Sequence, residues 1–240
     1  HTECSEMSKK YLGEQIDIHA GGEDLVFPHH ENEIAQSMAC HHHPIAHTWM
    51  HNQMINIDNQ KMSKSLGNVI WAKDMVAELG CNVVKWFMLS SHYRNPLNLT
   101  EEVLNSVKKE VAKVDNVIKS VSLYLQVNHI ANENYNKAAV DGMVGALEDD
   151  LNTSLALTKI LDQVKKLNLA FRQKEKNDKA IAIEYQTLLK MTAVIGFVFE
   201  PRKLNAAELE IYQAWLEAKQ NKDFETADKL RTQLIEKGII

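Results

Sequence analysis

The sequence predicts a short α/β region followed by a helical region, and three observations lead to this fold class. Up to about residue 60 the hydrophobic pattern changes every few residues, as in the βα alternation of a nucleotide-binding sheet. Beyond residue 70 apolar residues recur at three- and four-residue steps, which is typical of amphipathic helices. The 240 residues, 45% hydrophobic and 25% charged, are enough for one large or two modest domains.

The expected α/β region begins with a short strand at residues 16–19 and a turn at residues 20–24. Pro28 suits the first position of a helix, so we expect a helix from about His29 to Met38. Two more short strands are predicted at residues 48–51 and 54–57, and a polar loop follows them. This region therefore reads as part of a nucleotide-binding fold.

The helical region opens with a long amphipathic helix. Thr100 is a good N-cap and is followed by two glutamates that suit the positive end of the helix dipole. The apolar stripe comprises Val103, Val107, Val111, Val114, Ile118, Val121 and Leu125. Asn152 or Thr153 caps another helix, residues 180–198 read as a buried helix, and Asp223 caps the last one before Gly238. The polar stretches 128–136 and 200–205 are the expected connections.

Composition and charge limit the functional classes. The net charge of −5 gives no general attraction for nucleic acid, so an RNA partner needs a local basic surface. Residues 159–179 offer seven basic side chains against three acidic ones, although such runs are usually solvated helix faces. Three unpatterned cysteines argue against a disulfide framework, and no apolar stretch approaches the roughly 18 residues of a membrane span. We expect a cytoplasmic, monomeric protein without a membrane partner, whose sequence begins internally.

The most informative motif is the pentapeptide Lys61-Met62-Ser63-Lys64-Ser65, which is followed by Leu66-Gly67-Asn68. A given pentapeptide occurs by chance in about one in ten thousand chains of this length. It resembles the KMSKS loop of class I aminoacyl-tRNA synthetases. The resemblance implies that Lys61 and Lys64 are catalytic and that Lys64 contacts ATP, since lysines on a mobile loop stabilise the charge that develops on the pyrophosphate leaving group. The alternative is an ordinary solvated lysine-rich turn.

Residues 19–33, His-Ala-Gly-Gly-Glu-Asp-Leu-Val-Phe-Pro-His-His-Glu-Asn-Glu, resemble the signature of the cysteinyl-tRNA synthetase family, as do residues 1–5. Two glycines after a strand let the backbone approach a nucleotide, and a nearby carboxylate can accept hydrogen bonds from a ribose. Gly21, Gly22 and Asp24 are therefore the expected contacts for ATP, which such enzymes use with Mg²⁺. Taken alone, a Gly-Gly-x-Asp sequence is more often a plain turn.

A metal site is expected at Cys4, His29 and Glu33. His29 and Glu33 are four residues apart, so on a helix both side chains lie on one face and can bind one ion. Imidazole, thiolate and carboxylate ligands suit Zn²⁺. The resemblance implies such a trio plus one cysteine from an earlier part of the catalytic domain. Alone, a His-x-x-x-Glu pair is usually a surface pair. The cluster Cys40 to His43 has no matching ligand set, so we assign it no metal.

The resemblance covers the whole chain, densely before residue 100 and thinly from about 120 to 205. It implies the C-terminal half of a cysteinyl-tRNA synthetase: an α/β remnant of a class I Rossmann-type catalytic domain, a connector and an all-helical bundle. The expected divisions are residues 1–60 (catalytic remnant), 61–118 (KMSKS loop and helical connector), 119–204 (helical domain on the anticodon side) and 205–240 (helical hairpin). The implied partners are L-cysteine, ATP and tRNA(Cys). Because half a site cannot orient ATP, we expect this chain alone to be inactive.

Two other functions stay open. A related ligase joins cysteine to an amino sugar and shares the catalytic motifs, but it lacks a full anticodon-binding domain, so the long helical region argues against it. A non-catalytic RNA-binding or scaffolding module could also retain these motifs. An intact KMSKS sequence and three candidate zinc ligands make this second alternative less attractive.

Overall fold

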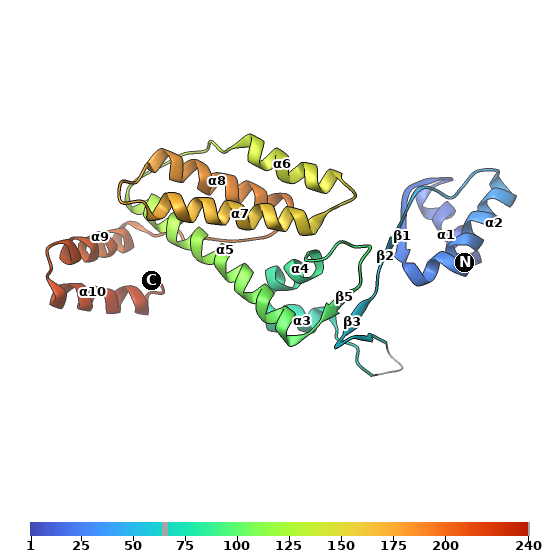
Figure 1. The fold of residues 1–240 in the computed structure, drawn as a ribbon, viewed down its shortest axis with the longest axis horizontal. Coiled ribbons are helices and arrows are strands. Elements are labelled where there is room, and N and C mark those ends of the chain that lie inside the picture. Colours follow the sequence, from blue (N-terminus) through green and yellow to red (C-terminus); the bar gives the residue numbers. More distant parts are fainter. Residues whose placement is uncertain (64–66, 240) are drawn as a thin grey trace. The chain divides into compact units, whose positions relative to one another are not determined.

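The structure is a computed structural model that describes residues 1–63 and 67–239 (Figure 1). It divides into two compact units, His1–Ser106 and Val107–Ile240, and the long helix α5 (Glu101–Val127) crosses the boundary between them. Within the described ranges, no helix is both long enough and apolar enough to cross a membrane.

The first unit contains a βαβ element that carries most of the candidate site. Strand β1 (Ile16–Gly22) and strand β2 (Ala46–Asn52) are parallel, and helix α2 (Glu31–His41) connects them. The register runs from the Ile16–Ala46 pair to the Gly22–Asn52 pair. Parallel strands need such a crossover because a tight turn would produce an antiparallel pair, whereas the chain here has to return to the end of the sheet at which β1 began. The strands predicted at residues 16–19 and 48–51 lie within β1 and β2.

Between β1 and α2 the chain passes through two short turns. After β1 it forms a short 3₁₀ turn, Glu23–Leu25, and a wide turn, Val26–His30, and regular α-helix begins only at Glu31. Phe27 is extended, with φ −131° and ψ 134°, and the Phe27–Pro28 peptide bond is cis. Phe27 is the one residue of Val26–His30 with non-helical backbone angles, so helical backbone runs from Pro28 into α2, as expected of a helix that starts at Pro28, although regular α-helix begins only at Glu31. A residue before proline is biased towards extended backbone, and Phe27 accordingly separates the preceding turn from this helix.

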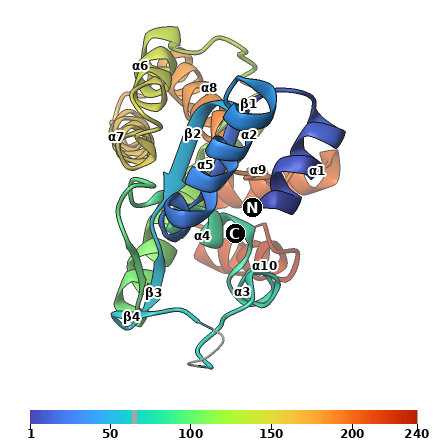
Figure 2. The same cartoon turned by 90° about the vertical axis from the view of Figure 1, so that its right-hand side faces the viewer.

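Helix α1 (Thr2–Leu12) was not predicted from the sequence, which suggested only that Cys4 lies upstream of the strand. None of its residues is buried, and Met7, Tyr11 and Leu12 are exposed. With no apolar stripe facing a core, the helix lacks the periodic signal on which the prediction relied. It lies alongside α2 (Figures 1 and 2).

A second, three-stranded sheet follows. Strand β3 (Ile55–Ile57) pairs antiparallel with β4 (Gln60–Lys61) and parallel with β5 (Leu97–Leu99). Helices α3 (Ala72–Leu79) and α4 (Cys81–Leu89) connect β4 to β5 along the chain. The predicted strand at 54–57 corresponds to β3. Strand β5 was missed because three residues are too few to show an alternating pattern.

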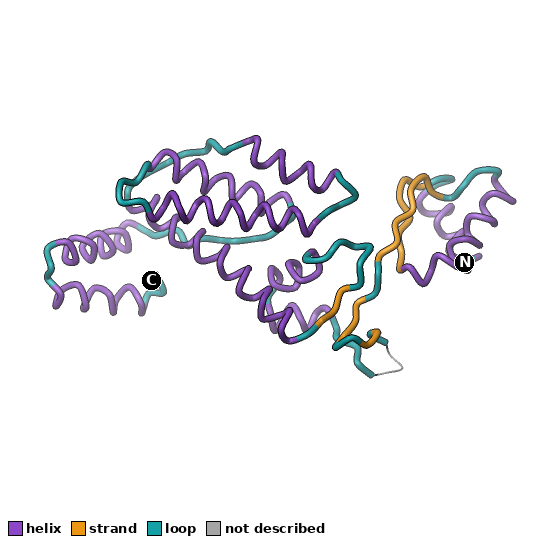
Figure 3. Tube along the Cα trace, in the orientation of Figure 1, coloured by secondary structure: helices purple, strands orange, loops and turns teal. Residues whose placement is uncertain are grey.

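The described part of the second unit consists of helices joined by loops (Figure 3). After α5 come α6 (Lys137–Glu148), α7 (Thr153–Arg172) and α8 (Asp178–Val194). The predicted caps are confirmed: Thr100 Oγ1 accepts a hydrogen bond from the Val103 backbone, and Asn152 Oδ1 accepts one from Leu155. The apolar residues of these four helices with 0% exposure are Val114, Ile118, Val121, Met143, Ala156, Ile160, Leu167, Ile181 and Leu188. Helix α8 ends before residue 198, because Gly196 turns the chain with φ 76°.

Helices α9 (Ala206–Gln220) and α10 (Phe224–Glu236) form a hairpin at the C-terminal end of the described chain. Asn205 and Glu208 form a capping box at the start of α9, and Asp223 caps α10 as predicted. Gly238 follows α10 with φ 64°, the left-handed conformation expected of a residue that ends a helix. The predicted connections at 128–136 and 200–205 contain loop and contribute the caps of the next helices.

Candidate metal and nucleotide site

The structure brings Cys4, His29 and Glu33 together. One ligand atom from each residue lies within 4.8 Å of those of the other two. His29 Nε2 is 3.1 Å from Glu33 Oε1. Ligand atoms about 2.0 to 2.3 Å from one tetrahedral ion lie roughly 3 to 4 Å from one another, so this grouping is close to the size that Zn²⁺ requires.

The three residues come from three separate segments. Cys4 lies in the first turn of α1, His29 in the wide turn after β1, and Glu33 in the first turn of α2. His29 and Glu33 keep their i, i+4 contact although regular α-helix begins only at Glu31. Cys4 reaches the pair only because α1 lies against α2.

Glu33 has an unusual environment for a carboxylate. Its relative exposure is 0%, and neither carboxylate oxygen has a hydrogen-bond partner in the described part of the chain. His19 Nε2 lies 2.8 Å from Oε2 and His29 Nε2 lies 3.1 Å from Oε1, and each contact is an ion pair only if the imidazole is protonated. His19 Nε2 likewise has no hydrogen-bond partner in the described residues. Burying a carboxylate that accepts no hydrogen bond is costly. A cation next to Oε1 would compensate this cost, so the donor set and the unsatisfied oxygens both fit a bound metal.

A second group of possible ligands shares Glu33. It consists of His19, His30 and Glu33, whose ligand atoms also lie within 4.8 Å of one another. Neither His19 nor His30 was identified from the sequence. Their signal was present, because His30 follows His29 directly and His19 ends the predicted strand, but their meeting depends on the fold of the βαβ element.

Aromatic and imidazole rings hold this histidine group in place. Trp49 stacks on His19, with ring centroids 4.5 Å apart and planes 18° from parallel. His30 Nδ1 is 2.8 Å from His51 Nε2, so one of these two rings donates and the other accepts. Burial lowers the pKa of His30 below its ordinary value; His19 acts in the same direction and Glu33 opposes it. The lowered pKa favours neutral imidazole at His30 near pH 7.

Gly21 has a packing reason to be glycine. A Cβ atom at this position would lie 2.7 Å from His30 Cε1 and 3.1 Å from Leu25 Cδ1. At Gly22 a Cβ would lie 2.5 Å from Asp24 Oδ1. The sequence motif assigns both glycines to nucleotide binding. In the structure they also let a histidine ring and a carboxylate approach the end of β1.

Two further residues predicted to act on ATP, Asp24 and Lys61, lie close to each other. Lys61 Nζ is 3.9 Å from Asp24 Oδ2, and both side chains are more than half exposed. Asn68 accepts a hydrogen bond from the Ser63 backbone (2.9 Å) and donates one to the Lys61 carbonyl (3.3 Å). This side chain therefore connects the two described ends of the KMSKS segment. Lys64 lies outside the described residues.

In the helical unit, three of the seven basic residues of the stretch 159–179 contact acidic or aromatic side chains. Lys165 forms an ion pair with Asp162 (2.9 Å) and Lys166 with Glu184 (2.7 Å). Lys176 Nζ lies over two aromatic rings, 4.4 Å from the Tyr124 centroid and 4.6 Å from that of Phe171. These rings and Lys176 line a groove of about 840 Å³.

Comparison with known proteins identifies domains in both units. Residues 1–109 match the family model of the class I (C) tRNA synthetase catalytic domain, and residues 144–200 match the DALR domain. The chain is 39% identical over 248 aligned residues to the cysteine–tRNA ligase of Bacillus cytotoxicus and 38% identical over 250 to that of Brevibacillus brevis. Each alignment covers 100% of this chain and 53% of the relative, so the chain spans about half the length of these proteins.

Solved structures support the fold. A leucyl-tRNA synthetase from Agrobacterium radiobacter K84 superposes with a TM-score of 0.61 and 16% identity, over 80% of this chain and 29% of that one. A methionyl-tRNA synthetase from Mycobacterium tuberculosis, solved with methionyl-adenylate, gives a TM-score of 0.52 at 18% identity, over 75% and 40%. The chain is therefore similar over its whole length to the matching half of these cysteine–tRNA ligases, and it combines part of a class I synthetase α/β fold with a helical region that matches the DALR domain.

Proposed function

We propose that this chain is part of a cysteine–tRNA ligase, which activates cysteine with ATP to cysteinyl-adenylate and transfers it to tRNA(Cys). One observation carries the proposal: in a homologue of such ligases, Cys4, His29 and Glu33 bring their ligand atoms within 4.8 Å of one another. This donor set suits Zn²⁺ and is formed by three segments of the catalytic unit.

The zinc assignment explains how a cysteine-specific site would reject serine. Bound Zn²⁺ supplies a coordination position that a substrate thiolate fills well and a hydroxyl fills poorly. Cys4, His29 and Glu33 would hold the ion. His19 would orient the carboxylate of Glu33 from its other oxygen, 2.8 Å away.

On the ATP side, we assign Gly21, Gly22 and Asp24 to nucleotide binding, with Lys61 and Lys64 acting on the phosphates together with Mg²⁺. The 3.9 Å approach of Lys61 to Asp24 supports this assignment, because it brings a phosphate-binding and a ribose-binding candidate to one place. The hydrogen bonds of Asn68 to Ser63 and Lys61 support the assignment, because they bring the described residues on the two sides of the motif together.

The match of residues 144–200 to the DALR domain favours a tRNA ligase over the amino-sugar ligase, which lacks a full anticodon-binding domain. The retained ligand set favours an enzyme over a non-catalytic module. The assignment to the C-terminal half of the ligase, the four divisions of the chain, a cytoplasmic location and a monomeric state all stay predictions.

Pyrophosphate exchange tests the proposal in the intact protein that contains this chain. We expect cysteine-dependent exchange of pyrophosphate into ATP, followed by charging of tRNA(Cys). Lys64→Ala should lower the exchange rate by about 10²-fold or more with little change in cysteine affinity, because the lysine acts on charge that develops in the transition state. Lys73→Ala, on α3 outside the motif, is the matched control.

Two results would contradict this proposal. Absence of cysteine-dependent exchange in the unsubstituted protein would remove the ligase assignment. Equal exchange rates with Lys64→Ala would leave the ligase assignment in place and remove Lys64 from the mechanism.

A further inference from the structure

We propose that Gln36 is a positioning residue that holds the Cys4 thiolate at the metal shared with His29 and Glu33. The inference rests on the proposed metal site and adds a residue that no ligand pattern identifies. Gln36 lies on α2, three residues after Glu33, and is partly exposed. On a helix, this spacing places the two side chains on neighbouring parts of one face.

Helix α1 needs such a contact because no apolar core holds it. None of its residues is buried, and a cavity of about 200 Å³ lies between α1 and α2, bordered by Ser5, Lys9, Gln36 and His41 among others. The position of α1, and with it that of Cys4, is therefore determined largely by polar contacts.

Gln36 contacts α1 on both sides of Cys4 along the chain. Its Oε1 accepts a hydrogen bond from Ser5 Oγ (2.9 Å), and its Nε2 donates one to Thr2 Oγ1 (3.1 Å). Ser5 Oγ also lies 3.0 Å from the His1 carbonyl, so its single hydrogen is shared between two acceptors. One side chain of α2 thus contacts two hydroxyls in the turn that carries the thiolate.

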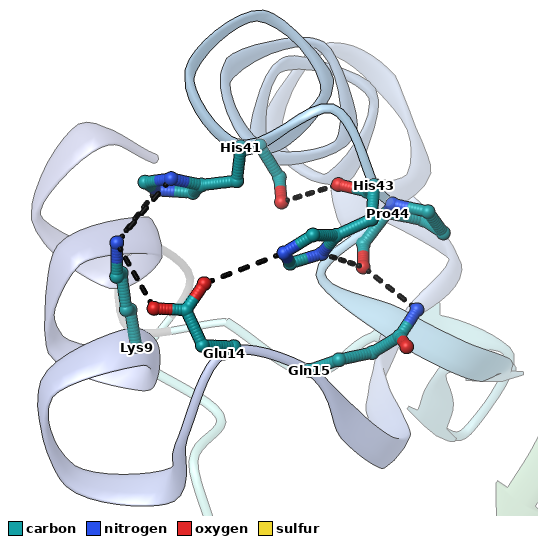
Figure 4. Close-up of polar contacts among 7 residues, drawn as sticks. Lys9, Glu14, Gln15, His41, His43 and Pro44 are labelled. Carbon is teal, nitrogen blue, oxygen red and sulfur yellow. Dashed lines mark hydrogen bonds and ion pairs between the residues drawn. The ribbon is translucent and has the colours of Figure 1, made fainter.

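A second polar group anchors the other end of α1, as Figure 4 shows. Lys9 Nζ lies 3.3 Å from His41 Nδ1 and 3.4 Å from Glu14 Oε1, and His43 Nε2 is 3.4 Å from Glu14 Oε2. These contacts hold the C-terminal end of α1 against the end of α2. If the Gln36 contacts are removed, α1 is expected to pivot about this end, and the largest displacement occurs at the turn that contains Cys4.

Cobalt spectroscopy of the 240-residue chain tests the inference without an activity assay. Co²⁺ bound by a thiolate shows a sulfur-to-metal charge-transfer band, whereas Co²⁺ bound only by imidazole and carboxylate does not. Gln36→Ala should reduce this band per bound ion and weaken Zn²⁺ binding by about 10- to 100-fold, as is usual when a residue that orients a ligand is removed. Ser5→Ala, a smaller change, should reduce the band in the same direction.

Gln15→Ala is the matched control. Gln15 also makes a side-chain hydrogen bond in this unit, to the Pro44 carbonyl at 3.0 Å, but it lies beyond the C-terminal end of α1, whereas Cys4 lies in the first turn of that helix (Figure 4). It should leave the band and the Zn²⁺ affinity unchanged. Cys4→Ser should abolish the band.

The outcomes separate the two proposals. If the unsubstituted chain binds Co²⁺ without a charge-transfer band, the ligand assignment of Cys4 fails. If the band is present and disappears in Cys4→Ser, but both Gln36→Ala and Ser5→Ala keep the full band and the original Zn²⁺ affinity, the metal site stands and the role of Gln36 is overturned.

Discussion

At the scale of single residues, Gly21 is both a predicted nucleotide contact and a position where packing leaves no room for a side chain. The ring of His30 occupies the space that a side chain would take, and this ring is held in turn by Trp49 and His51. Gly21→Ala should therefore destabilise the first unit by about 1–3 kcal/mol, the usual cost of overpacking a site whose neighbours cannot move away. Urea unfolding measures this difference.

Gly142 provides the opposite expectation. It lies within α6, and a Cβ there would meet no atom within 4 Å. Gly142→Ala should stabilise the chain by about 0.5–1 kcal/mol, because alanine loses less backbone entropy in a helix. Equal effects of the two substitutions would show that the approach of His30 to Gly21 does not constrain the site.

At the scale of elements, a hydrogen bond from Tyr124 links helices α5 and α8 of the second unit. Tyr124 on α5 donates to Asp178 Oδ1 at the start of α8, at 2.6 Å. Burial, followed by this bond to a carboxylate, raises the pKa of Tyr124 from 10.0 to about 12. A raised pKa in the folded state contributes stability that is complete below about pH 10 and is lost as the pH rises towards 12.

Tyr124→Phe should therefore lower stability near neutral pH by about 1 kcal/mol, the typical net value of one hydrogen bond. Urea midpoints compared at about pH 8 and about pH 11 should fall less in this variant than in the unsubstituted chain. Tyr11→Phe, in an exposed side chain of α1, controls for the loss of a phenol. Parallel pH profiles of the two variants would contradict the link between Tyr124 and α8.

At the scale of the whole molecule, a chain with net charge −5 has to bind RNA through a local surface. Residues 159–179 remain the candidate, and we select Lys165, Lys166 and Arg172 from them as the predicted phosphate contacts. In the described structure Lys165 and Lys166 form ion pairs with carboxylates, whereas no ion pair is found for Arg172. Replacing all three with alanine should weaken tRNA binding and flatten its salt dependence. The slope should fall by up to about 0.9 for each phosphate that is no longer neutralised.

A matched control separates local from global charge. Replacing Lys108, Lys109 and Lys113 of α5 lowers the net charge by the same three units in exposed positions of the same unit. This variant should keep the original salt slope. If both triple variants change binding equally, residues 159–179 act only through the net charge, and the solvated-face interpretation is correct.

By itself, the sequence determined the elements whose signals are local. The apolar stripe of α5, the caps Thr100, Asn152 and Asp223, and the strands that became β1 and β2 all follow from spacings of a few residues. The i, i+4 pair of His29 and Glu33 is local in the same sense. Both residues lie on the helical backbone that starts at Pro28, as the sequence predicted, although regular α-helix begins only at Glu31.

Only the tertiary structure showed that His19 and Trp49 lie near Glu33, and how Cys4, which the family resemblance assigned to the metal, comes close to it. His19 approaches Glu33 from the middle of β1, Trp49 of β2 stacks on His19, and Cys4 lies on a helix that has no buried residue. These contacts depend on the parallel register of β1 and β2 and on the contacts of Gln36 with α1. No short-range pattern encodes either feature, because each joins segments that are about 30 residues apart in the chain.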